Sequence, residues 1–330
     1  MTVTSERPDY VSQGRQGYYD TLRTLSVASV DHHFDAFKDI DWDDPDFVVD
    51  RNDERWILGP EDNLGAHPWY RTLPRDRQIE VGIYRWALIC KVGLQFEQLL
   101  ISGIMFDNLK RRNGNPEFRY STHEATEECH HTQMFQEFVN RTGTDVAGAP
   151  TWFRRLIPLV AMLGYWAPAG FWMGVLAGEE PIDHLQKRLL RANGNLHPML
   201  RRIISIHVAE EARHIGFAHQ YLTQHTPHLS GRQRALLGLA TPLVMRLLCD
   251  VIMRPSAEAI EAMGIPEEVA REIWWDNPEA GKFLRDLFAD VRMLFDDLGL
   301  RGPVARRLWR AMGIDGRPAR YRSEPAAAAH

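Results

Sequence analysis

The feature that most constrains the fold is a short motif, Glu-x-x-His, which occurs twice in stretches with helical spacing. The two copies are Glu128-Cys129-His130-His131 and Glu211-Ala212-Arg213-His214. Residues three apart lie on one face of a helix, so each motif presents a carboxylate beside an imidazole. His207 lies one turn before Glu211 and shares its face. The two motifs can act together only if their helices turn these faces towards each other.

Apolar residues at helical spacing predict four long helices, at about residues 78–112, 121–141, 152–193 and 198–225. Asn113-Gly114-Asn115-Pro116 is a stop signal for the first helix, and Ser121 with Glu124 predicts a capping box at the start of the second. Pro198 fits the first turn of the fourth helix. Further helices are expected after residue 230, and no alternating strand pattern occurs. The pattern therefore predicts an all-α protein.

We expect the chain to divide into three parts. Residues 1–78 have few helical signals and form an irregular N-terminal arm, whose aromatic residues such as Trp42 and Trp56 pack it on the body. Residues 79–315 form the helical bundle with its additional C-terminal helices. Residues 316–330, which end in an alanine-rich stretch, are predicted to be a disordered tail.

Each of the other two core helices carries a glutamate at or beside an apolar run. These residues are Glu97 and Glu180. Glu97 lies between Phe96 and Leu99, where an unpaired buried carboxylate would cost several kcal/mol; a buried Arg or Lys partner is the alternative explanation. One Glu from each of two helices and Glu-x-x-His from each of the other two form the metal site of ferritin-like di-iron and di-manganese bundles. Oxygen and nitrogen ligands without thiolate favour iron or manganese over structural zinc. We therefore predict a ferritin-like four-helix bundle core.

The register of the first motif has to be chosen. Glu127 and His130 also form Glu-x-x-His, but His130 shares its helix face with charged residues. His131 shares its face with Phe135 and therefore points inwards. We choose Glu128 and His131.

The third helix leaves a second choice between adjacent glutamates. Periodicity alone favours Glu179, which lies on the apolar stripe that includes Trp172. Gly178 and Pro181 make this periodicity unreliable, because they favour a kink or a bulge. Residue spacing therefore leaves Glu179 and Glu180 open.

Three segments carry a resemblance to a known family. They are Phe96-Glu97-Gln98-Leu99, Glu128-x-x-His131-Thr132 and His207-x-x-x-Glu211-x-x-His214. In these motifs, over about residues 80–300, the sequence resembles the di-iron arylamine N-oxygenases, the family of p-aminobenzoate N-oxygenase. The resemblance implies that the metal ligands are Glu97, Glu128, His131, Glu180, His207, Glu211 and His214. Counting back from His207 without gaps decides for Glu180, and Glu179 is the alternative.

The resemblance also implies residues that bind the substrate. The family's arginine that anchors a substrate carboxylate falls on Arg292, while a family tyrosine falls on Ile89 and a family asparagine on His184. We therefore expect a small organic substrate with an anionic group held by Arg292. Because Ile89 is less polar than tyrosine, we expect the body of the substrate to be bulkier or more apolar than that of p-aminobenzoate. The alternatives are a surface histidine at 184 and a pairing of Arg292 with neighbouring aspartates.

The implied function is that of a non-haem di-iron oxygenase. Two Fe(II) ions would reduce dioxygen to a bridged peroxide that oxidises the substrate, by resemblance at an amine nitrogen; a mixed Mn/Fe site stays open. The chain contains no Gly-x-Gly-x-x-Gly loop, so electrons would come from a separate reductase or a small reductant. The alternative is a non-catalytic iron-binding protein or ferroxidase of the ferritin-like superfamily.

Composition indicates which partners and which cellular compartment to expect. The net charge of −5 and the absence of a basic cluster argue against nucleic acid as a partner. Three widely separated cysteines suit a reducing compartment, so we expect a cytoplasmic protein, which we predict to be a homodimer. Residues 156–178 are uncharged and long enough to cross a bilayer, but their prolines and glycines favour a buried helix and no membrane.

Overall fold

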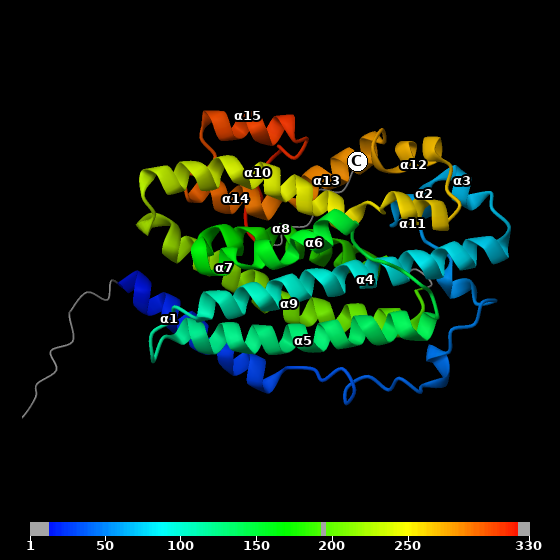
Figure 1. The fold of residues 1–330 in the computed structure, drawn as a ribbon, viewed down its shortest axis with the longest axis horizontal. Coiled ribbons are helices and arrows are strands. Elements are labelled where there is room, and N and C mark those ends of the chain that lie inside the picture. Colours follow the sequence, from blue (N-terminus) through cyan, green and yellow to red (C-terminus); the bar gives the residue numbers. More distant parts are fainter. Residues whose placement is uncertain (1–12, 193–195, 323–330) are drawn as a thin grey trace, which may run out of the picture.

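The computed structural model describes residues 13–192 and 196–322 of the chain (Figure 1). Within these ranges the regular elements are all helices, so the predicted all-α fold is confirmed. Four long helices form the core. They are α4 (Arg75–Asn108), α5 (Pro116–Thr142), α8 (Pro168–Arg191) and α9 (Pro198–His225). Helix α4 packs along α5 and α8 packs along α9, while contacts of α5 with α9 and of α4 with α8 close the bundle.

The start of α5 differs from the prediction. The helix begins at Pro116 rather than near Ser121, because Asn115 caps it by accepting a hydrogen bond from the backbone N–H of Glu117. Proline in the first turn needs no N–H donor, so the Asn-Pro pair starts the helix as well as stopping the preceding one. Glu124 is consequently not a capping residue but a buried residue in the middle of α5.

The predicted third helix is three helices. They are α6 (Thr151–Ala161), α7 (Leu163–Trp166) and α8. The break before α8 falls at Ala167, which leaves the helical region with φ −144° and ψ 65° because Pro168 follows it. Pro181, in contrast, lies inside α8, which continues to Arg191. Residue 193, the predicted end of this helix, lies outside the described residues.

These breaks divide the uncharged segment 156–178 among three helices. Two other stretches, Arg75–Asn108 and Gly231–Ala262, are long and apolar enough to cross a membrane by length and composition. Their most apolar windows are 56% and 50% buried inside the protein, as the core helix of a soluble protein would be, so they are weak evidence for a span.

The N-terminal arm is only partly irregular. Helix α1 (Gln13–Asp31) packs against α5 and α9, which corrects the expectation of few helices in residues 1–78. The chain then passes through short helical turns to α4. These are η1 (Pro45–Phe47), η2 (Glu54–Trp56), α2 (Asn63–Ala66) and α3 (Pro68–Arg71). Trp42, Trp56 and Tyr70 are buried, so this part of the arm packs on the body.

The C-terminal helices cover one side of the core. They are η3 (Thr226–His228), α10 (Gly231–Met253), α11 (Ala257–Ala262), α12 (Glu267–Trp274), α13 (Pro278–Leu287), α14 (Ala289–Asp297) and α15 (Pro303–Ala311). Helix α10 packs on α8 and carries α15 (Figure 1). Part of the predicted disordered tail is held in place, since Arg322 Nη2 donates to the carbonyl of Ala212 at 3.0 Å. Residues 323–330 of that tail lie outside the described residues.

Candidate metal centre

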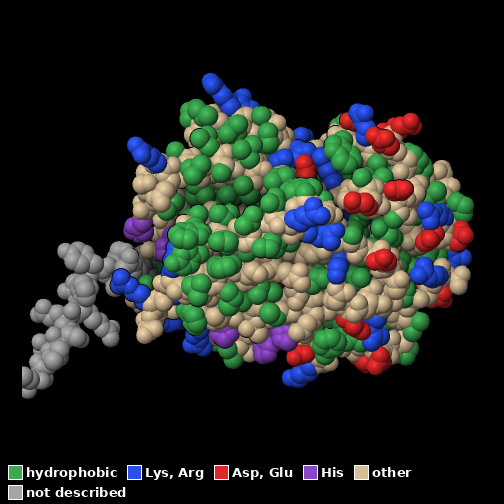
Figure 2. Space-filling model, in the orientation of Figure 1, with side chains coloured by type: hydrophobic (Ala, Val, Ile, Leu, Met, Phe, Trp, Pro, Cys, Tyr) green, Lys and Arg blue, Asp and Glu red, His purple; other side chains and the backbone are tan. Residues whose placement is uncertain are grey.

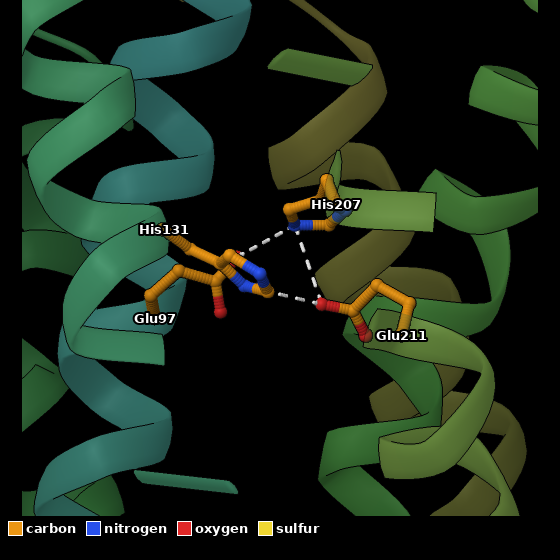
Figure 3. Close-up of side chains that lie close together, drawn as sticks. All are labelled: Glu97, His131, His207 and Glu211. Atoms are coloured by element: carbon orange, nitrogen blue, oxygen red, sulfur yellow. Dashed lines mark hydrogen bonds and ion pairs between the residues drawn. The ribbon is translucent and has the colours of Figure 1, made fainter. Parts of the chain in front are cut away.

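Two overlapping groups of carboxylates and imidazoles meet between the core helices. The first group is Glu97, His131, His207 and Glu211, and the second is Glu128, Glu179, Glu211 and His214. Within each group the potential ligand atoms lie within 4.8 Å of one another, and every member is buried. Figure 3 shows the first group converging from α4 and α5 on one side and from α9 on the other. Glu211 belongs to both groups, which is the position of a ligand that bridges two ions.

Two carboxylates of these groups lack hydrogen-bond partners, while Glu97 and Glu128 each meet an imidazole nitrogen of the groups. Both oxygens of Glu179 and both oxygens of Glu211 are buried without a hydrogen bond. Among the described residues, no Lys or Arg side chain pairs with any glutamate of the two groups, which removes the alternative explanation for Glu97. Buried polar atoms without partners indicate a missing ligand. Two divalent cations would balance the charge of four carboxylates, so the donor set fits a two-metal site.

The electrostatics agree with a site built for cations. Burial raises the pKa of Glu97 well above its ordinary value, and the negative charges of Glu128 and Glu211 raise it further. Burial likewise raises the pKa of Glu179, with a contribution from Glu211. Burial lowers the pKa of His207 to about 4, which leaves this imidazole neutral with a lone pair to offer. These carboxylates are costly to ionise without cations between them.

Each histidine turns one ring nitrogen towards the groups and hydrogen-bonds the other. His131 Nε2 lies 2.8 Å from Glu210 Oε2, His214 Nε2 lies 2.7 Å from Glu127 Oε2, and His207 Nδ1 lies 2.9 Å from Gln186 Oε1. An acceptor on one nitrogen keeps the ring proton there and leaves the lone pair of the other nitrogen for a metal. With a cation in the site, these hydrogen bonds would favour the tautomer that a ligand needs. Without one, Glu128 faces the inner nitrogens of His131 and His214 and, although burial disfavours the charged rings, raises the pKa of both, that of His131 to about 10.

Glu127 and Glu210 play equivalent parts. Glu127 of α5 hydrogen-bonds His214 of α9, and Glu210 of α9 hydrogen-bonds His131 of α5. Arg213 joins them, with Nη2 at 2.9 Å from Glu127 Oε1 and 3.5 Å from Glu210 Oε1. The segment after α1 closes this outer side, because the N–H of Phe34 donates to Glu210 Oε1 at 3.0 Å and Arg213 donates to the carbonyl of His32. Sequence reasoning missed these roles. The available signal was that both motifs read Glu-Glu-x-x-His.

A cavity of about 550 Å³ leads from the surface to these groups. Its inner end is formed by the buried residues Glu97, Glu179 and His207. Its walls come mainly from apolar residues of α4, α6, α7, α8 and α10. The volume is within the range of sites for small organic ligands.

Comparison with known proteins decides the family. The family model described as "P-aminobenzoate N-oxygenase AurF" matches residues 15–299. This chain belongs to the AurF family. The family is one of oxygenases, which supports an oxidoreductase. The sequence is also 52% identical over 308 residues to the uncharacterized proteins Rv0885 of Mycobacterium tuberculosis and Mb0909 of Mycobacterium bovis, covering 93% of this chain and 91% of each relative.

The structure brings six of the predicted AurF-type ligands together and replaces the seventh. Glu179, not Glu180, lies in the second group. Glu180 is buried against His219, whose Nε2 meets Glu180 Oε1. The role of Glu180 as a metal ligand stays a prediction, and Glu179, the alternative, is the glutamate that the structure places with the other donors. The physical reason is that α8 continues through Pro181, so the helical periodicity that favoured Glu179 holds across this turn.

The two adjacent glutamates make a matched pair for a test. We expect Glu179→Gln to lower the iron content of the reconstituted protein strongly, because a neutral amide is a poor ligand and leaves the second group with fewer charges. Glu180→Gln should keep the iron, although it weakens the contact with His219. Metal analysis of both variants decides the point, and iron loss confined to Glu180→Gln would contradict the assignment.

The residues predicted to bind the substrate are only partly at the cavity. Ile89 lines it. Arg292 is 1% exposed, lies outside the lining and donates to the backbone carbonyls of Arg285, Ile314 and Arg317. His184 faces Asp290 of α14, with Nε2 at 3.7 Å from Oδ2. The substrate-binding roles of Arg292 and His184 stay predictions that this structure does not favour, because both side chains point to the C-terminal helices.

Proposed function

We propose that this AurF family member is a non-haem di-iron oxygenase that adds oxygen from O2 to the nitrogen of an aryl amine. The observation that carries the proposal is the position of the two overlapping donor groups at the inner end of an organic-sized cavity. Glu97, Glu179 and His207 belong both to the groups and to the lining, so a bound molecule would reach the ions directly.

The two donor groups would each bind one of two metal ions. Glu97, His131 and His207 would hold one ion and Glu128, Glu179 and His214 the other, with Glu211 between them. When bound, iron would supply the electrons and the open coordination positions needed to activate O2.

The surroundings would keep these ligands in place. Glu127, Glu210 and Gln186 would hold the imidazole rings through their second nitrogens. The apolar walls of the cavity would exclude water from the reacting atoms.

The proposed reaction has a fixed balance of atoms and electrons. One oxygen atom of O2 forms a bond to the amine nitrogen and gives a hydroxylamine, and the other leaves as water. This consumes two electrons and two protons, which a separate reductase or a small reductant would supply. A neutral amine nitrogen is the nucleophilic partner, so the substrate should react as the free base.

The alternative, a ferroxidase or iron-binding protein without an organic substrate, shares the metal site but has no use for the cavity. The test is a single turnover. The protein is reconstituted with Fe(II) and mixed with isotopically labelled O2 and an aryl amine such as 4-propylaniline, and products are identified by mass spectrometry. We expect a hydroxylamine with one labelled oxygen. Oxidation of the iron with no oxidised product from a panel of aryl amines would favour the ferroxidase and contradict the proposal.

A further inference from the structure

The chemistry of the cavity walls restricts what can occupy it. Among the described residues that line the cavity, none is Lys or Arg. The polar side chains other than tryptophan are Glu97, Glu179, Gln186, His207 and Gln233. The oxygen of Gln186 is taken by His207, and that of Gln233 accepts from the backbone N–H of Ser230 at 2.9 Å. An anionic group along the walls would therefore meet no Lys or Arg side chain, only neutral donors such as the NH2 groups of Gln186 and Gln233, so burying its charge there is unfavourable.

Three glycines on one face of α8 give the cavity its length. Gly170, Gly174 and Gly178 are four residues apart, lie one above another on the helix, and all line the cavity. A Cβ atom at Gly174 would meet nothing within 4 Å, and one at Gly170 or Gly178 would make only ordinary contacts. Glycine inside a helix makes the helix less stable than alanine would. Close packing does not explain the three glycines, because a Cβ atom would fit at each of them.

Glycines that serve packing look different in the same protein. A Cβ at Gly103 would lie 2.0 Å from Phe171 Cε2, and one at Gly164 would lie 2.0 Å from the carbonyl oxygen of Gly103. These two glycines allow α4, α7 and α8 to approach. The glycines along α8 instead keep space open beside Glu179, whose buried oxygens have no hydrogen bond.

The outer end of the cavity is also apolar. Its lining includes exposed side chains from α6, α7 and α10. They are Trp152, Leu156, Leu163, Trp166, Leu236 and Leu247. Trp166 is 71% and Leu236 69% exposed. Figure 2 shows hydrophobic side chains gathered on this face, over α6, α7 and α10. A molecule that enters here meets apolar surface from the mouth to the donor groups.

We propose that the substrate is an uncharged, elongated apolar molecule, such as an aryl amine with an alkyl chain, which lies along the glycine face of α8 with its polar end at Glu97, Glu179 and His207. The aryl amine end of this description rests on the proposed function. The apolar, uncharged body rests on the walls alone, and it replaces the expectation of a substrate carboxylate held by Arg292.

The test measures binding without turnover. Iron-loaded reduced protein is titrated anaerobically, by calorimetry, with 4-methyl-, 4-ethyl-, 4-propyl- and 4-butylaniline and with p-aminobenzoate. Each added methylene should tighten binding about fourfold, because each buries further apolar surface. p-Aminobenzoate should bind more weakly than 4-ethylaniline, which has similar length and no charge.

Two glycine variants complete the design. Gly174→Leu fills the open space and should abolish the fourfold gain for the longer chains. Gly17→Leu makes the same change in α1, where a Cβ would also meet nothing within 4 Å, and should leave the series unchanged. Equal binding of p-aminobenzoate and 4-ethylaniline, or a chain-length series unaffected by Gly174→Leu, would overturn the inference. If affinity rises with chain length as predicted but O2 oxidises none of the aryl amines, the result would support the inference and count against the proposed function.

Discussion

Replacement of Glu211 by alanine is expected to remove both metal ions from the protein. Glu211 is the residue shared by the two donor groups, and its carboxylate lies 3.3 Å from His207 Nε2 and 3.6 Å from the nitrogens Nδ1 of His131 and His214. Loss of an outer hydrogen bond alone costs roughly 10- to 100-fold in metal affinity. Loss of a ligand common to both ions should cost more at each site, and metal analysis after gel filtration measures it.

A second buried glutamate provides the control for this experiment. Glu117 is 2% exposed on the same helix as Glu128 but bonds to Tyr18, Arg111 and His225 rather than to the donor groups. Glu117→Gln should lower stability and keep the iron. Retention of one full ion by Glu211→Ala would show that Glu211 serves a single site and would refute its bridging position.

Replacement of Arg292 by leucine should destabilise the fold without changing the metal site. Its guanidinium donates to the carbonyls of Arg285, Ile314 and Arg317 at distances of 2.6–3.1 Å, so it ties the segment after α15 to α14. Burial lowers its pKa to about 10, which still leaves it charged at neutral pH. Removing such a group leaves buried acceptors unpaired, and we expect a loss of about 3–5 kcal/mol in the free energy of unfolding.

Urea unfolding of Arg292→Leu measures this loss, and Arg306→Leu is the matched control. The side chain of Arg306 is 57% exposed and pairs with Asp296 at 3.3 Å, so its loss should cost no more than about 1 kcal/mol. Iron content and binding of aryl amines should be unchanged in both variants. An Arg292→Leu protein of normal stability that no longer binds p-aminobenzoate would instead restore the role predicted from the sequence.

The sequence predicted the core helices well because their limits depend on local chemistry. Helix α9 begins at Pro198 and ends at His225. Proline in the first turn and Pro227 after the last turn predict these two limits. The split of residues 152–193 was missed, because Pro158 and Pro168 look alike in sequence. Pro158 stays inside α6 and only Pro168 follows a break, and nothing in the local sequence distinguishes the two positions.

The sequence predicted those residues of the site whose positions follow from the periodicity of a single helix. The faces of α5 and α9 gave His131, Glu211 and their neighbours, which the structure brings together. The choice of Glu180 over Glu179 came from counting across the connection to α9, where a difference of one residue in length shifts the register by one position. The doubled glutamate of each motif marked Glu127 and Glu210 in the sequence, but their partners on the other helix, like the backbone acceptors of Arg292, depend on the tertiary fold.

The iron content of the wild-type protein tests the central claim most directly. The protein is reconstituted anaerobically with excess Fe(II), freed of loose metal and analysed for iron and zinc, with Glu211→Ala treated in the same way. Four buried carboxylates and three imidazoles in two overlapping groups predict about two iron ions per chain in the wild type and almost none in the variant. A single zinc ion per chain, or equal iron in the two proteins, would contradict the account.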